Sequence, residues 1–221
     1  RPAVAALAEG DPGPRRDAAR DALARLAVPP TSRLELRLLG PVELLESGAP
    51  VQSKDWRRER VRSLLAYLAL NGTVSRGQVA DDLWPGLDVE AQSRNLRVTL
   101  TYLLRVLEPG RGKRDASFFV RQHGNNVSLH AGGWLTVDVW DFDAACERAA
   151  QEDRRGASAA ALGHALRAVE LWRGEPTDLA SDPWAVSPVE QRRVRFAATA
   201  TRAGELVLAR GDPDRAQDLA E

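Results

Sequence analysis

The residues from Ala91 to Gly110 combine an apolar seam with an unusual polar face. One side of the stretch carries leucines at the spacing that aligns side chains along a helix: Leu96, Leu100, Leu103 and Leu107. At about 100° per residue, the opposite side gathers arginines and β-branched residues, with two further side chains at its margins: Arg94, Val98, Thr101 and Arg105, then Arg97 and Tyr102. No Asp or Glu occurs between Ala91 and Leu107, whereas a merely solvated face usually carries Glu, Lys and Gln.

This set of side chains suits the major groove of DNA. Arginine binds guanine in bidentate fashion, the methyl groups of Val and Thr pack on the thymine methyl group, and a carboxylate would be repelled by the phosphates. We therefore expect Arg94, Val98 and Thr101 to lie near base edges, with Tyr102 beside them. Arg97 and Arg105, which lie lateral or late on the helix, are expected to hold phosphates. The alternative is that Val98 packs against a neighbouring hairpin and the arginines are only solvated.

The segments around this helix predict how it is positioned. Leucines alternate with charged residues at the start of residues 33–53, which predicts a small antiparallel sheet of two or three short strands. Helices are predicted over residues 57–72 and 75–86, the second with Ser75 as its N-cap and Trp84-Pro85 as its stop. The order of sheet and three helices, followed by a hairpin, is typical of a winged helix-turn-helix, whose third helix enters the major groove.

The hairpin that would form the wing is predicted over residues 117–131, with its turn at residues 123–126. Arg121, Asn125 and Asn126 would then reach the minor groove or a phosphate. The alternative is that the Gly-Asn-Asn sequence is only a turn of conformationally tolerant residues.

The remainder of the chain is predicted to be helical. Helices are expected over residues 141–153, 157–174 and 187–211, and a fourth begins at residue 212. Their Ala/Leu spacing indicates helical pairs of the tetratricopeptide type. Asp138 and Asp141 are expected to cap the first of these helices. Four tryptophans are expected to fill joints between helical layers, or alternatively to line a ligand pocket: Trp134, Trp140, Trp172 and Trp184.

The composition is that of an ordinary globular protein and excludes few classes of function. The 221 residues include 43% hydrophobic and 28% charged residues, with a net charge of zero. Residues 33–131 hold 15 basic and 11 acidic residues, whereas residues 132–221 hold 11 basic and 16 acidic residues, so only the first part is expected to meet a polyanion. The lone Cys146 allows no internal disulfide and indicates a reducing compartment. The three histidines show no metal-ligand spacing, so no catalytic residue, metal or cofactor is expected.

Several motifs together resemble the Streptomyces antibiotic regulatory proteins, or SARPs. They occur in order along the chain: "LRLLGPVEL", "RRERVRSLLAYLALN", "VADDLWPG", "RNLRVTLTYLLRVLEP", "VDVWDFDAAC" and "ALRAVELWRGEPTDL". The resemblance implies an α+β OmpR-type winged-helix DNA-binding domain over residues 33–131. It also implies an all-α, TPR-like bacterial transcriptional activation domain over residues 132–221, which is expected to be cut short. Residues 1–32 are rich in Ala, Arg and Pro, and they are expected to be a linker from an upstream domain.

The resemblance also implies a function and partners. Proteins of this family are activators that bind direct repeats in promoter DNA as side-by-side protomers and recruit RNA polymerase holoenzyme. The polymerase contact would come from the loop between the second and third helices: Pro85, Gly86, Leu87, Asp88 and Glu90. A cytoplasmic, nucleoid-associated protein is expected, with no membrane contact by this segment, although an upstream anchor stays open. The alternatives are a winged helix that serves as a protein-docking surface and a helical part that senses a small-molecule effector.

Overall fold

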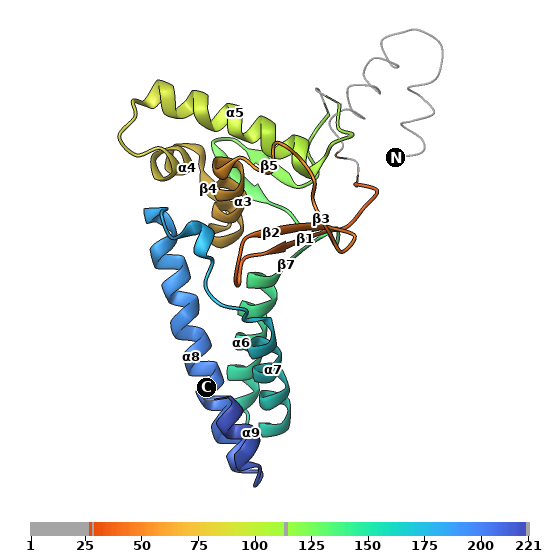
Figure 1. The fold of residues 1–221 in the computed structure, drawn as a ribbon, viewed down its shortest axis with the longest axis vertical. Coiled ribbons are helices and arrows are strands. Elements are labelled where there is room, and N and C mark those ends of the chain that lie inside the picture. Colours follow the sequence, from red (N-terminus) through yellow and green to blue (C-terminus); the bar gives the residue numbers. More distant parts are fainter. Residues whose placement is uncertain (1–26, 28, 113–114, 220–221) are drawn as a thin grey trace.

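The computed structural model describes Ala27, residues 29–112 and residues 115–219. The expected linker over residues 1–32 therefore lies mostly outside the described residues. Figure 1 shows a mixed α/β part in the upper half and a bundle of long helices below it. Within the described residues, no helix is both long and apolar enough to cross a membrane.

The first sheet has four strands in the order β3-β2-β1-β7. β1 (Leu34–Arg37) pairs antiparallel with β2 (Glu43–Glu46), which pairs with β3 (Ala49–Pro50). On its other edge β1 pairs in parallel with β7 (Leu135–Val137). The prediction of two or three antiparallel strands therefore missed a fourth strand, β7, which runs parallel to β1. The expected domain boundary after residue 131 falls between the wing and this last strand of the sheet.

Three helices follow the first three strands, and local sequence signals set their ends. α3 (Glu59–Asn71) ends at Gly72, whose φ of 71° suits glycine. β4 (Val74–Ser75) leads into α4 (Arg76–Leu83), and the Ser75 hydroxyl accepts a hydrogen bond from the Gln78 amide, as its predicted N-cap role requires.

The third helix, α5 (Val89–Leu107), begins two residues earlier than the sequence indicated. Its N-cap is Asp88, whose carboxylate accepts from the Ala91 amide at 2.8 Å. Glu90 therefore belongs to the first turn of a helix and not to the loop in which it was expected.

The predicted hairpin is present as β5 (Val120–His123) and β6 (Asn126–Leu129), joined at Gly124 and Asn125. Gly124 has a φ of 57°, the conformation that a two-residue hairpin loop demands. β6 also pairs with β4, which gives a second sheet in the order β4-β6-β5. The strand between the first two helices thus ties the wing to the start of α4.

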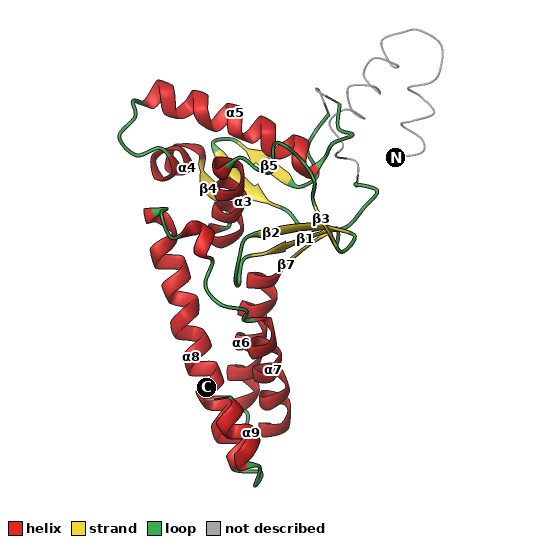
Figure 2. Ribbon diagram, in the orientation of Figure 1, coloured by secondary structure: helices red, strands yellow, loops and turns green. Residues whose placement is uncertain are grey.

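The lower half consists of helices, as expected (Figure 2). They are α6 (Asp138–Arg154), α7 (Ser158–Leu171), α8 (Val186–Leu208) and α9 (Pro213–Asp218). Alanines at the contact let the helices approach closely and form a small buried cluster of their own: Ala149, Ala161, Ala165 and Ala203. Two 3-10 turns that the sequence did not indicate, Thr177–Leu179 and Pro183–Ala185, connect α7 to α8.

The upper and lower halves share one hydrophobic core. The indole Nε1 of Trp140 on α6 donates to the Ala69 carbonyl on α3 at 2.7 Å. The Trp184 ring lies edge-on to Tyr67 of α3, with ring centroids 4.9 Å apart. Trp172 instead stacks on Phe196 within the lower half, at 4.7 Å. These three tryptophans therefore lie at packing joints, as the sequence predicted.

A buried carboxylate reinforces this joint next to Trp184. Asp182, between the two 3-10 turns, accepts from Ser63 at 2.7 Å and from Arg60 at 2.8 Å, both on α3. Ser63 and Asp182 are both buried, so these hydrogen bonds satisfy polar groups that solvent hardly reaches.

Asp138 does not cap α6 as expected, because the N-cap residue is Val137. Its carboxylate instead accepts from the amides of Leu38 and Leu39, at 2.8 to 2.9 Å, in the turn after β1. Arg173 contacts the same carboxylate at 3.4 Å. Burial raises the pKa of Asp138, while the two amides and Arg173 oppose that rise. Asp141 lies exposed on the first turn of the helix.

Candidate nucleic-acid interface

One side of α5 packs against the core, and the opposite side, its open side, is exposed. All four leucines of its predicted seam are buried against the core. Figure 1 shows α5 along the upper edge of the part of the chain that the structure describes, with α3 and α4 beneath it and no described element above it. The division between a buried and an open side follows from the apolar spacing, because the leucines fix the rotation of the helix about its axis.

The open side carries the side chains that the sequence singled out. Tyr102 is half-buried, and the other five are exposed: Arg94, Arg97, Val98, Thr101 and Arg105. Val98 is 46% exposed, so the wing does not enclose it as the alternative required. The Thr101 hydroxyl donates to the Arg97 carbonyl at 2.9 Å, which leaves its methyl group as the part available for an apolar contact.

A residue that the sequence did not indicate joins this face at its margin. The guanidinium carbon of Arg58 lies 4.2 Å from the centroid of the Tyr102 ring, and that of Arg105 lies 5.6 Å from it. Arg58 stands in the segment before α3 and far from α5 in sequence. No periodicity or spacing connects it to Tyr102, so only the tertiary fold could reveal the contact.

The predicted wing residues Arg121, Asn125 and Asn126 are all exposed on the hairpin. The Asn125 carbonyl accepts from the Arg76 amide at 2.8 Å, and the Arg76 side chain donates to Gln122 at 2.5 Å. The turn is therefore fixed to the start of α4 and is more than a flexible tip. Burial and the nearby positive charge of Arg121 lower the pKa of His130, which follows the last strand of the wing.

The loop before α5 presents apolar side chains to solvent. Leu87 is 45% exposed and the neighbouring Val89, which the sequence did not indicate, is 77% exposed. Asp88 is engaged as the N-cap of α5, whereas Glu90 is exposed. Pro85 and Gly86 are exposed at the turn, and Trp84 packs against the core.

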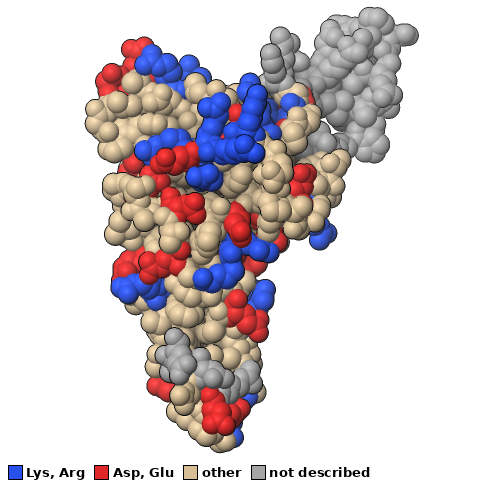
Figure 3. Space-filling view, viewed as in Figure 1, with Lys and Arg blue, Asp and Glu red and all other residues tan. Residues whose placement is uncertain are grey.

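Basic side chains are concentrated where this face lies. Figure 3 shows Lys and Arg gathered over α5 and the elements next to it, with acidic and basic residues intermixed over the lower helices. Among the described residues, no group of three His, Cys, Asp or Glu side chains is arranged to hold a metal ion. A surface of this kind is suited to contacts with a polyanion.

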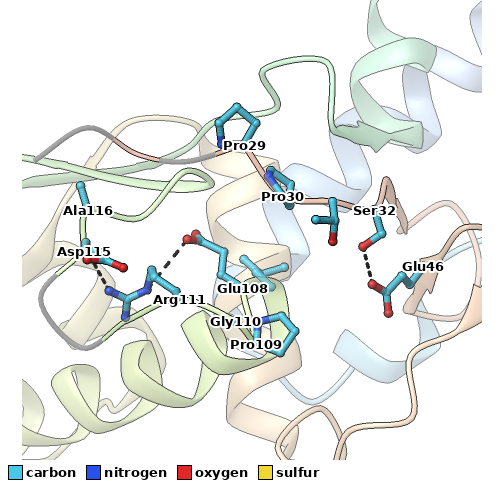
Figure 4. A pocket seen from close by; sticks show the side chains of 12 residues that line it. Pro29, Pro30, Ser32, Glu46, Glu108, Pro109, Gly110, Arg111, Asp115 and Ala116 are labelled. Carbon is cyan, nitrogen blue, oxygen red and sulfur yellow. Dashed lines mark hydrogen bonds and ion pairs between the residues drawn. The ribbon is translucent and has the colours of Figure 1, made fainter. Parts of the chain in front are cut away.

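A cavity of about 280 Å³ lies at the end of α5, between its last turn and residues 29–32 (Figure 4). Its principal acid, Glu108, accepts hydrogen bonds from the Ser117 hydroxyl and from the amides of Phe118 and Phe119. Arg111 donates to the Asp115 carbonyl at 2.6 Å. These hydrogen bonds connect the end of α5 with residues 115–119, which precede the wing.

Comparison with known proteins gives a structural likeness only. No family model matches the sequence, and no curated protein matches it. Among solved structures, the chain is similar to Mycobacterium tuberculosis EmbR in complex with a low-affinity phosphopeptide, with 22% identity and a TM-score of 0.61. The match covers 81% of this chain and 49% of the EmbR chain. The two proteins therefore share a fold, and this chain spans about half the length of EmbR.

Proposed function

We propose that this chain is a sequence-specific DNA-binding transcriptional activator of the SARP type. The observation that supports the proposal most directly is the open side of α5, where exposed arginines flank an exposed valine and a threonine. Arginine and methyl groups can distinguish guanine and thymine in the major groove. The helix-turn-helix arrangement with its wing, and the structural likeness to EmbR, support the same function.

The proposal divides the open side into two roles. Arg94, Val98 and Thr101 read base edges, while Arg97 and Arg105 bind phosphates. Arg121 and the asparagines of the wing contact the minor groove or a phosphate beside it. Two protomers bind side by side on direct repeats, and the helices of residues 132–221 act as the activation domain. The described lower half offers no observation that identifies a small-molecule effector.

Arg94→Ala should weaken binding to the preferred site by about 1–3 kcal/mol and relax base preference at one position. Arg105→Ala should weaken binding to all DNA sequences alike, and it should make the slope of log K against log salt concentration shallower by about one. Both follow from the division between base and phosphate contacts. The measurement is fluorescence anisotropy with a preferred duplex, obtained by selection from random sequence, and with a scrambled duplex at several salt concentrations.

The same titrations test the rival function, a winged helix that docks proteins. A wild-type chain with no affinity for any duplex at low salt would exclude the DNA-binding proposal. If the two arginine variants behave alike across sequences, DNA binding survives but the division of roles between Arg94 and Arg105 does not.

The exposed apolar loop is proposed as the surface that engages RNA polymerase holoenzyme. Leu87→Ser should leave DNA affinity within about two-fold of wild type, because Leu87 precedes α5 and is exposed. Promoter transcription with purified holoenzyme should nevertheless fall. Val89→Ser serves as a neighbouring variant that tests whether the apolar patch extends into α5. Full activation by Leu87→Ser would assign the polymerase contact elsewhere.

A further inference from the structure

We infer that Arg58 is a phosphate contact of the DNA interface, held in place by Tyr102 and Asp55 and acting beside Arg105. The inference rests on the proposed function and extends the DNA-binding surface from α5 to the segment before α3. It assigns to Arg58 the DNA backbone as its ligand, without any part in choosing the base sequence.

The position of Arg58 is set from two sides. Its Nε donates to the Asp55 carboxylate at 3.1 Å, and its guanidinium lies over the Tyr102 ring at 4.2 Å. The Asp55 side chain is only 8% exposed, whereas that of Arg58 is 49% exposed. The guanidinium is therefore oriented by a buried acid and an aromatic face, yet half of the side chain faces solvent.

The rest of the segment is also fixed. Trp56 is buried in the main core, next to Asp55. The Arg58 amide donates to the Asp55 carbonyl at 3.3 Å, and the Asp55 amide donates to the Ser53 hydroxyl at 3.2 Å. An arginine held in this way loses less conformational entropy on binding than one on a free loop.

The donors left over on Arg58 are those that a phosphate would use. Only Nε is hydrogen-bonded to a residue that the structure describes, so the two Nη groups are available. An arginine fork that keeps its Nη groups can bind a phosphate oxygen pair while its ring partner supports the guanidinium plane.

The second observation is the pairing of Arg58 with Arg105. Both guanidinium groups lie over the same Tyr102 ring, which places two positive charges within roughly one Debye length, about 10 Å, of each other. Tyr102 stands at the margin of the open side of α5, where a phosphate chain would border the groove. Two cations at this border, of which Arg58 is held in place, can contact neighbouring phosphates and set how the helix is aligned in the groove.

The test compares the salt dependence of DNA binding for single variants. Arg58→Ala should weaken binding about five- to ten-fold at about 0.1 M salt, on the preferred and on a scrambled duplex alike, and reduce the salt slope by about one. Arg58→Lys should retain the slope, because the charge remains. Arg148→Ala, which removes an exposed arginine from α6, should change neither quantity.

A double-mutant cycle tests the role of Tyr102. In a Tyr102→Leu background, Arg58→Ala should weaken binding by a smaller factor than it does alone, because the aromatic support is already lost. Stoichiometric titration gives the active fraction of each preparation, so a variant that folds poorly is not mistaken for one that binds poorly.

Each result bears on the inference. An unchanged salt slope for Arg58→Ala, or an effect confined to one sequence, would overturn it. If Arg94→Ala alters base preference while Arg58→Ala leaves the slope intact, only this inference fails. If the wild type binds neither duplex, the proposed function fails together with it.

Discussion

Leu103→Ala lowers the free energy of unfolding by about 2–5 kcal/mol, and DNA affinity falls with it. Leu103 is fully buried on the seam of α5, so its truncation leaves a cavity under the helix that presents the proposed base contacts. Urea unfolding followed by circular dichroism measures the stability change, and anisotropy with the preferred duplex measures the loss of binding. The same helix offers its own control five residues earlier, on the opposite side.

Val98→Ala is that matched control. Nearly half of the Val98 side chain is exposed, so the free energy of unfolding should change by no more than about 0.5 kcal/mol. Affinity for the preferred duplex should fall nevertheless, because the methyl groups proposed to meet thymine are removed. A destabilisation as large as that of Leu103→Ala would mean that the outer side of α5 is covered in solution.

Asp138→Ala is expected to destabilise the protein by about 2–5 kcal/mol. The substitution leaves the amides of Leu38 and Leu39 without their acceptor in a buried turn, and each unsatisfied buried group costs about 1–3 kcal/mol. Asp138→Asn keeps one carbonyl oxygen and should have a smaller effect. Urea unfolding gives both values at a single pH.

The same experiment shows whether the two halves unfold together. Because the upper and lower halves share one core, tryptophan fluorescence and helical circular dichroism should report one coincident transition for wild type and for both Asp138 variants. Separate transitions in the wild type would contradict the shared core. A destabilisation by Asp138→Ala no larger than that by Asp138→Asn would contradict the role of the Asp138 side chain as acceptor for the two amides.

Local signals in the sequence predicted most of the upper half. The leucine spacing of α5, the Ser75 cap and the glycine of the hairpin each act within a few residues, so they can be identified without tertiary information. The exposure of the arginines on α5 follows from the same spacing. The predicted start of α5 was two residues too late, because the capping role of Asp88 was not recognised in the sequence.

Features that depend on distant segments were missed. β7 has three residues and pairs with a strand about one hundred residues earlier, so no local alternation identifies its parallel partner. Asp138 looked like a helix cap because an acid at a helix start usually is one, but its carboxylate lies against a turn of the first sheet. Arg58 belongs to the same class, since its contact with Tyr102 exists only in the folded chain.

The parallel strand β7 has a practical consequence for anyone who isolates the part proposed to bind DNA. A fragment that ends after the wing would uncover one flank of β1, whose free amide and carbonyl groups can recruit a strand from another molecule. Such a fragment should be prone to aggregation even if its recognition helix is intact. Extending it through the first turns of α6 would keep that flank covered and retain the carboxylate that holds the adjacent turn.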